Sequence, residues 1–330
     1  MRAAIRALAA ALAGLALTGC VMVVDPSGLL RRGHDLKEHT LEGEGRDKIV
    51  LVDVTGLISD RPSRQAFGLA QQASVLARVD GALRRARKDD RVRAVVLRVD
   101  SPGGTVAASD ELYARIRAFR ADTGVPVVAA LGGVAASGAY YAACAADVIV
   151  AQPATVTGSI GVILVSVNFA GLMDKLGVQD ATYTAGANKA LVSPLRTATP
   201  AQRAIVQTVL DGMHARFRQV VVESRPGVRG ADLPTLTDGR ILGAQDALAA
   251  GLVDRVGRLH DALALARELA GVKAARVVQY APPGGTRDGV YAHLEVSAGP
   301  GAAALAEAAA AFTAVEAVPM YLWAPGLPVY

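Results

Sequence analysis

Two glycine-rich segments could bring a serine hydroxyl together with backbone N–H donors. Residues 100–105 read Asp-Ser-Pro-Gly-Gly-Thr, and residues 132–138 read Gly-Gly-Val-Ala-Ala-Ser-Gly, with Ser137 next to last. Adjacent glycines let the backbone turn its N–H groups outward, where they can bind the charge that develops on an attacked carbonyl oxygen. Taken alone, Ser137 would more often be the N-cap of a helix. The pairing of the two segments favours nucleophilic acyl transfer.

A serine nucleophile needs a base, and a nearby histidine is missing. No serine has glycine both two residues before and two residues after it, and the five histidines lie outside the glycine-rich middle: His34, His39, His214, His260 and His293. Lysine is the alternative, because arginine in practice keeps its proton. The chain has 29 arginines and six lysines, and no acidic residue lies within seven positions of Lys189. Lys189 is therefore the candidate base, with Lys175 as its rival.

Metal and nucleotide chemistry have no matching motif. The sequence contains no His-Glu-x-x-His, and its two cysteines are too few for a four-cysteine zinc site. Neither Gly-x-Gly-x-x-Gly nor a phosphate-binding P-loop motif is present. We therefore expect neither a metal nor a cofactor.

Strand-like apolar runs alternate with helical patterns along the middle of the chain. The runs are residues 49–54, 94–99, 125–131 and 148–151, and the helical patterns cover about 65–88, 105–120, 137–146, 200–224 and 244–250. This alternation predicts an α/β fold with a mainly parallel sheet flanked by helices. Both glycine-rich segments follow strands of that sheet, so they leave it at the same end.

The composition excludes several classes of protein. The 330 residues are 52% hydrophobic, 4% aromatic and 20% charged, which is too apolar for an intrinsically disordered chain. The 34 glycines follow no three-residue period, so the chain is not collagen-like. The formal net charge is +5, but no basic run is interleaved with aromatic residues. We therefore expect no nucleic-acid partner.

The N-terminus has the parts of a secretory signal. Arg2 and Arg6 precede an apolar run over residues 7–17, and the sequence Leu17-Thr18-Gly19-Cys20 ends it. The run is too short to span a bilayer, which takes about 20 apolar residues. The ending resembles a bacterial lipobox, in which Cys20 is lipidated and becomes the new N-terminus. An ordinary signal peptide with a chance cysteine, or an uncleaved anchor, is the alternative.

These observations divide the chain into four segments. Residues 1–19 are expected to be a lipoprotein-type signal peptide, 20–47 a lipid anchor and tether, 48–272 one catalytic domain, and 273–330 a C-terminal extension. Cys144, which then has no disulfide partner, is expected to be a small core residue.

Four motifs in order resemble the signal peptide peptidase SppA family. They are Ser101-Pro102-Gly103-Gly104, residues 136–141 (Ala-Ser-Gly-Ala-Tyr-Tyr), residues 157–162 (Thr-Gly-Ser-Ile-Gly-Val) and Gly186-Ala187-Asn188-Lys189. With later matches at 238–240 and 251–254, the resemblance spans about residues 48–260. It implies a ClpP/crotonase-like spiral of ββα units and a serine peptidase with a Ser–Lys catalytic dyad.

The resemblance also implies a role for each site residue. Ser137 matches the nucleophile, Lys189 the general base, and Ser159 a serine that hydrogen-bonds the lysine amine. Neutral Lys189 would take the Ser137 proton, and water would later hydrolyse the acyl-enzyme. Three glycines match the oxyanion hole: Gly103, Gly104 and Gly138.

Substrate, assembly and location are implied in the same way. Similar proteins are membrane-associated endopeptidases that degrade cleaved signal peptides or other membrane-derived peptides. Those of this length form ring-like homo-oligomers whose sites combine neighbouring subunits. A lipid on Cys20 would attach the exported chain to a membrane of the bacterial cell envelope.

Two other classes of protein stay open. One is a crotonase-like acyl-transfer enzyme, which an export signal disfavours because acyl-CoA is cytoplasmic. The other is a catalytically silent lipoprotein that uses the fold for binding or assembly.

A serine-reactive probe distinguishes the peptidase from both alternatives. We expect the wild-type protein to be labelled covalently, because a serine next to a base attacks such probes, and Ser137→Ala to lose the label. Intact-mass measurement counts the adducts. Labelling of Ser137→Ala at the wild-type level would contradict the assignment.

Overall fold

The computed structural model describes residues 36–65, 70–228, 232–281, 289–291 and 319–322. The predicted lipidation site Cys20, the signal peptide and most of the C-terminal extension lie outside these residues. Within the described part, no helix is both long enough and apolar enough to cross a membrane.

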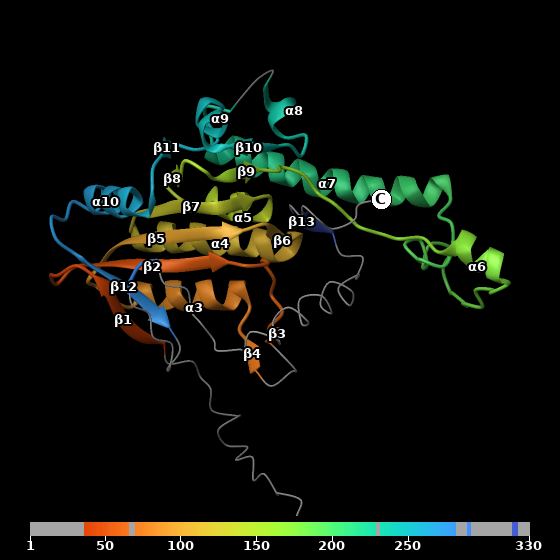
Figure 1. Cartoon of the computed structure of the whole chain (residues 1–330), viewed down its shortest axis with the longest axis horizontal. Helices are drawn as coiled ribbons and strands as arrows, with labels where there is room; N and C mark the ends of the chain where they lie inside the picture. Colours follow the sequence, from red (N-terminus) through yellow and green to blue (C-terminus); the bar gives the residue numbers. More distant parts are fainter. Residues whose placement is uncertain (1–35, 66–69, 229–231, 282–288, 292–318, 323–330) are drawn as a thin grey trace, which may run out of the picture. The chain divides into compact units, whose positions relative to one another are not determined.

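A mainly parallel sheet forms the centre of the fold (Figure 1). In spatial order its strands are β1 (Lys37–Glu42), β12 (Arg276–Ala281), β2 (Lys48–Thr55), β5 (Val92–Ser101), β7 (Val127–Ala136), β8 (Val148–Ala151) and β11 (Arg255–Val256). Along this order every pair is parallel except β1 with β12. From β2 to β8 the spatial order follows the chain order, because after each strand a helix returns the chain to the end of the sheet at which the parallel strands begin.

Helices cover both faces of the sheet. One face packs against α3 (Val75–Arg87), α4 (Val106–Thr123) and α5 (Gly138–Ala143), and the other against α10 (Leu259–Leu269). Successive residues of a strand point to opposite faces. In β5, Val95 and Leu97 therefore belong to the first core, and Ala94 and Val96 to the second. Both cores need apolar residues, which explains the continuous apolar runs of the sequence.

Short elements complete the structure. The hairpin strands are β3 (Ser63–Gln65) and β4 (Ala70–Gln72), and β6 (Gly103–Thr105) pairs with β13 (Met320–Leu322). Strand β9 (Val156–Gly158) pairs with the end of β7 and with β10 (Ile241–Gly243). The remaining helices are α6 (Ala170–Leu176), α7 (Pro200–Ser224), α8 (Leu233–Leu236) and α9 (Ala244–Ala249).

The predicted fold class is confirmed, and one predicted helix begins too early. The expected helix over residues 65–88 starts only at Val75, after the β3–β4 hairpin. Ser74 caps it, because its Oγ accepts the N–H of Ala77 at 3.2 Å. Cys144 is buried in the core, and this burial raises the pKa of its thiol to about 11.

The sheet recruits strands from outside the segment expected to be the catalytic domain. Strand β1 comes from the expected tether, and β12 comes from the expected C-terminal extension. Strand β12 pairs in parallel with β2, and β1 covers β12. Without them β2 would be an edge strand with unpaired backbone groups, and such edges promote unwanted association.

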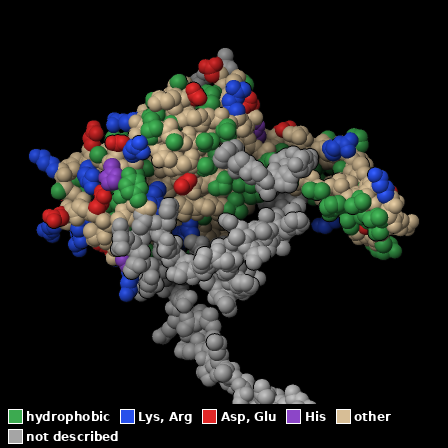
Figure 2. All heavy atoms as spheres, in the orientation of Figure 1, with side chains coloured by type: hydrophobic (Ala, Val, Ile, Leu, Met, Phe, Trp, Pro, Cys, Tyr) green, Lys and Arg blue, Asp and Glu red, His purple; other side chains and the backbone are tan. Residues whose placement is uncertain are grey.

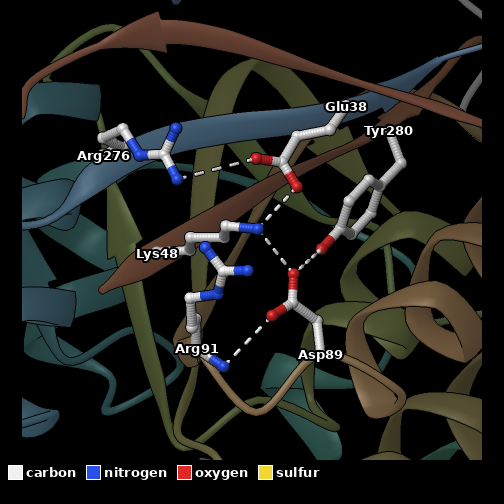
Figure 3. A network of polar contacts seen from close by, with 6 residues as sticks. All are labelled: Glu38, Lys48, Asp89, Arg91, Arg276 and Tyr280. Carbon is white, nitrogen blue, oxygen red and sulfur yellow. Dashed lines mark hydrogen bonds and ion pairs between the residues drawn. The ribbon is translucent and has the colours of Figure 1, made fainter. Parts of the chain in front are cut away.

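A buried ion network ties these added strands to the sheet (Figure 3). Lys48 at the start of β2 is only 4% exposed, and its Nζ lies 2.7 Å from Glu38 Oε2 of β1 and 2.7 Å from Asp89 Oδ2. Burial by itself would raise the pKa of Asp89. Hydrogen bonds from Lys48 and from the backbone N–H of Arg91 outweigh it and bring this pKa below its ordinary value. The Tyr280 hydroxyl also donates to Asp89, at 3.4 Å.

Removing the Lys48 ammonium should destabilise the fold. We expect Lys48→Met to lower the free energy of unfolding by about 3 kcal/mol at pH 7, because Glu38 and Asp89 would be left without their shared cation. Lys37→Met on exposed β1 is the matched control, with an expected change of at most about 0.5 kcal/mol. Urea denaturation measures both.

The same comparison has an expected pH dependence. Because Asp89 has a lowered pKa in the folded chain, its contribution is complete above about pH 4 and is lost as the pH falls through the folded value. The stabilities of wild type and Lys48→Met should therefore converge in acid. A difference that stays constant from neutral pH into acid would show that Asp89 is not the source.

Candidate active site

Ser137 joins β7 to α5 through a strained backbone. Its φ is 55° and its ψ is −119°, and the other described non-glycine residue with positive φ is Ser159, at 51°. The Ser137 N–H donates to Gly158 O at 2.8 Å, and its carbonyl accepts the N–H of Tyr141 at 2.9 Å. Such conformations cost about 1–3 kcal/mol and collect at functional sites.

The Ser137 hydroxyl is buried and unused. The residue is 1% exposed, and its Oγ has no hydrogen-bond partner among the described residues. Although Ser137 occupies the N-cap position of α5, it makes no side-chain cap hydrogen bond. Capping of α5 therefore does not explain the Ser137 side chain. A nucleophile, in contrast, needs a hydroxyl that is not engaged in another hydrogen bond.

Ser159 lies beside Ser137. The parallel register pairs Ala136 of β7 with Gly158 of β9, and the two serines are the next residues on each strand. The Ser159 N–H donates to Arg240 O at 2.7 Å, which attaches it to the turn before β10. Ser159 is 8% exposed, and no hydrogen bond of its hydroxyl is found in the described part of the chain.

The three glycines predicted as the oxyanion hole meet at this point. A Cβ on Gly103, whose φ is +105°, would lie 2.8 Å from Gly138 N, and a Cβ on Gly138 would lie 3.2 Å from Gly104 N. The Gly103 N–H donates to Ser101 Oγ at 3.1 Å, so it is already occupied. Gly138 is the first residue of α5, where no carbonyl of that helix can accept its N–H. Gly138 thus has a donor suited to an oxyanion.

Asp100 and Thr157 hold the turn that delivers Ser137. Asp100 Oδ1 accepts the N–H of Val134 at 3.1 Å, and Thr157 Oγ1 donates to Ala135 O at 2.7 Å. Both contacts lie within three residues of Ser137 in the sequence, so they constrain its backbone. Neither residue was among the predicted site residues.

A cluster of aromatic rings adjoins the glycines. Tyr141 stacks on Tyr321 of β13, with 5.2 Å between ring centroids, and Phe217 of α7 contacts both rings. The Tyr141 hydroxyl donates to Asp110 Oδ1, and burial together with that bond raises the pKa of Tyr141. Sequence reasoning missed Tyr321, because the segment around it contains no motif and its partners are distant in the sequence.

Lys189 lies on a solvent-exposed arm and not at Ser137. We call residues 164–209 the arm; they comprise α6, the turns after it and the first part of α7. Lys189 is exposed, and its ammonium makes no hydrogen bond or ion pair with other described residues. The first buried residue of α7 is Phe217, about 25 Å of helix beyond Pro200. Lys175, the rival base, is also exposed, on α6. Within one chain, the predicted nucleophile and the predicted base therefore lie apart.

The arm carries much of the exposed hydrophobic surface. Ten of the fifteen large hydrophobic side chains found exposed among the described residues belong to it: Val167, Phe169, Leu172, Leu176, Val178, Tyr183, Val192, Leu195, Ile205 and Val209. Figure 2 shows hydrophobic side chains grouped at the α6 end. Exposed apolar surface of this extent is typical of an association surface.

Among the described residues, no three His, Cys, Asp or Glu side chains cluster in a way that could hold a metal ion. The groups that lie together at the site are serine hydroxyls and backbone N–H donors. These suit acyl transfer through a serine.

Comparison with known proteins points to the same chemistry. Residues 120–273, which include Ser137, Ser159 and Lys189, match the description Peptidase family S49. The chain is similar to "Putative signal peptide peptidase SppA" of Enterococcus faecium, with 35% identity over 250 residues that cover 75% of this chain and 71% of the relative.

Two longer relatives match in part. The chain is 38% identical over 192 residues to "Protease 4" of Salmonella typhi, covering 58% of this chain and 30% of that protein. It is 32% identical over 229 residues to "Serine protease SPPA, chloroplastic" of Arabidopsis thaliana, covering 69% and 33%. The match therefore covers about a third of the length of these two proteins.

A side chain at Gly103 should disable the site. We expect Gly103→Ala to lower kcat for peptide hydrolysis at least about 100-fold, because the added side chain would displace the Gly138 N–H, and this is the usual effect of losing an oxyanion-hole donor. The added Cβ would lie 2.8 Å from Gly138 N and 2.0 Å from Tyr321 O, at a φ that alanine rarely adopts.

Gly124→Ala is the matched control for this substitution. Gly124 also has a positive φ, +67°, but a Cβ there would meet nothing within 4 Å. It should cost about 1 kcal/mol of stability and leave kcat unchanged. Equal kcat values for the two variants would remove Gly103 from the site.

Proposed function

The chain belongs to peptidase family S49 and is a serine endopeptidase, and from this premise we propose that Ser137 is its nucleophile and Lys189 its general base. The observation that carries the proposal is the buried Ser137 hydroxyl, which has no hydrogen-bond partner among the described residues and lies on a strained turn beside three glycines. A serine endopeptidase is neither the crotonase-like acyl-transfer enzyme nor the catalytically silent lipoprotein of the two alternatives.

The proposed reaction forms and hydrolyses an acyl-enzyme. Neutral Lys189 accepts the Ser137 proton as Oγ attacks the peptide carbonyl, and the Gly138 N–H stabilises the oxyanion. Protonated Lys189 then gives its proton to the leaving amine as the C–N bond breaks. Water, deprotonated by the same amine, releases the acyl product. The Ser159 hydroxyl, one residue beyond the Ala136–Gly158 pair, orients the lysine amine.

We propose that Lys189 serves the active site of a neighbouring subunit. Lys189 is exposed and about 25 Å of helix separates its arm from the first buried residue of α7, whereas Ser137 is enclosed in the core. A second subunit would cover the apolar side chains of the arm and bring its lysine to the first subunit's serine. In a closed ring of such head-to-tail contacts, every active site receives a lysine from a neighbouring subunit.

The proposed substrates are peptides derived from membranes, above all cleaved signal peptides. The name of the Enterococcus relative supports this class of substrate. A lipid on Cys20, in a segment outside the described residues, would attach the enzyme to a membrane of the bacterial cell envelope, where such peptides remain after secretion.

Mixing two inactive variants tests the shared site. We expect Ser137→Ala and Lys189→Ala each to lose peptide hydrolysis. If subunits exchange at random in a head-to-tail ring, an equal mixture should recover about one quarter of the wild-type rate, because one site in four receives both groups. The rate is measured with a fluorogenic peptide after mixing under conditions of subunit exchange.

Lys175→Ala is the matched control for the lysine, because it also lies on the arm and is exposed. It should keep wild-type activity, and an equal mixture with Lys189→Ala should reach about half of that rate, because one site in two receives an intact Lys189. A mixture that stays inactive although mass measurement shows mixed oligomers would contradict the shared site. Full activity of either single variant would contradict the dyad itself.

A further inference from the structure

The turn formed by residues 238–240 lies directly against Ser159. It precedes β10, which pairs antiparallel with β9 (Figure 1). The Ser159 N–H donates to Arg240 O at 2.7 Å, which continues this pairing by one residue. A Cβ built on Gly158 would lie 3.0 Å from the same oxygen, so the turn also contacts the residue before Ser159. The Arg240 carbonyl therefore holds the backbone of Ser159 from outside its own strand.

Ser159 needs such a contact because its backbone conformation is unfavourable. Its φ is 51°, in the left-handed region that serine rarely adopts. A residue of this kind keeps its conformation only where the surrounding structure fixes it. The direction of the Ser159 hydroxyl follows from this backbone, since the side chain leaves from the same Cα. The group that orients Arg240 O therefore also orients the hydroxyl proposed to hold the lysine amine.

The Asp238 carboxylate holds both the backbone and the side chain of Arg240. Its Oδ1 accepts the backbone N–H of Arg240 at 3.0 Å. The guanidinium donates as well, from Nε to Oδ1 at 3.0 Å and to Oδ2 at 3.1 Å, and from Nη2 to Oδ2 at 2.7 Å. These side-chain bonds, followed by the backbone bond, lower the pKa of Asp238 to about 2, so the carboxylate stays charged at neutral pH.

The turn is anchored to the core at its beginning and exposed beyond that point. Thr237 is 1% exposed, and its carbonyl accepts a hydrogen bond from His214 Nε2 of α7 at 2.6 Å. The side chains of Asp238 and Arg240 are 44% and 47% exposed, and a Cβ on Gly239 would meet nothing within 4 Å. Exposed ion pairs contribute little to stability. The geometry that Asp238 maintains at Arg240 therefore explains the pair better than its energy does.

We propose that Asp238 is a positioning residue of the peptidase, which sets the direction of the Ser159 hydroxyl by fixing the Arg240 carbonyl. This role rests on the proposed function, in which Ser159 orients the Lys189 amine. Asp238 acts through Ser159 and touches no reacting atom. Its loss should therefore slow proton transfer and leave peptide binding unchanged.

A double-mutant cycle in the full-length protein tests this route. We expect Asp238→Ala and Ser159→Ala each to lower kcat for a fluorogenic peptide at least about tenfold, with KM within about twofold of wild type, because proton transfer loses its alignment. Independent losses would multiply to at least about 100-fold in the double variant. Because Asp238 acts through Ser159, the double variant should instead have the kcat of Ser159→Ala within about twofold.

Two control variants separate positioning from a general loss of structure. Asp238→Asn keeps an oxygen that can accept the Arg240 N–H and is also favoured in turns, so its kcat should stay within about threefold of wild type. Glu111→Ala breaks an ion pair of similar exposure on α4, with Arg115 at 2.6 Å, and should leave kcat and KM unchanged. Urea denaturation should give Asp238→Ala and Glu111→Ala the midpoint of the wild type.

Four results would overturn the role of Asp238. In the first, the two losses multiply in the double variant. In the second, Asp238→Ala keeps the wild-type kcat. In the third, Asp238→Asn is as slow as Asp238→Ala, so that the bond to the Arg240 N–H is not the cause. In the fourth, Asp238→Ala does not fold, which would make the carboxylate part of the structural framework.

The mixing experiment tests the dyad separately, because its variants keep both Asp238 and Ser159. Full activity of Lys189→Ala there would contradict the proposed base. Multiplied losses in the cycle would contradict only the role of Asp238.

Discussion

The active site depends on the close approach of backbone segments that are distant in the sequence. The segments that follow β2, β5 and β7 approach one another so closely that Gly103, Gly104 and Gly138 have no space for a side chain. A Cβ on Gly104 would lie 1.9 Å from Ile58 O, and a Cβ on Gly138 would lie 2.3 Å from Ser109 Oγ. Glycine is therefore required for steric reasons, and the same crowding brings N–H donors to the place where charge develops.

Core and arm contribute differently to the proposed chemistry. The core fixes Ser137 in a strained conformation that only a rigid surrounding can maintain, with hydrogen bonds before and after it in the chain. Lys189 is on an exposed arm with large apolar side chains, so the environment of its amine depends on the surface that covers that arm. If a second subunit covers it, catalysis is coupled to assembly, and a dissociated subunit would not hydrolyse peptides.

The C-terminal strand β13 contacts the glycine turn of the site. Strand β13 pairs with the strand that carries Gly103 and Gly104, and Tyr321 completes an aromatic cluster with Tyr141 and Phe217. Burial of a tyrosine ring stabilises the bound strand, but the strand contributes only three residues to a two-stranded sheet.

Local signals in the sequence determined the fold class, the α7 helix and the serine on its glycine-rich turn. Thr199 and Pro200 begin α7 where predicted, because a cap and a fixed φ act within one turn of helix. Tertiary structure alone decided that β1 and β12 complete the sheet, that Lys48 is buried between two carboxylates, and that Tyr321 packs on Tyr141 and Phe217. Strand pairing and side-chain burial arise between distant segments, and their energies depend on the assembled neighbours, which no local pattern encodes.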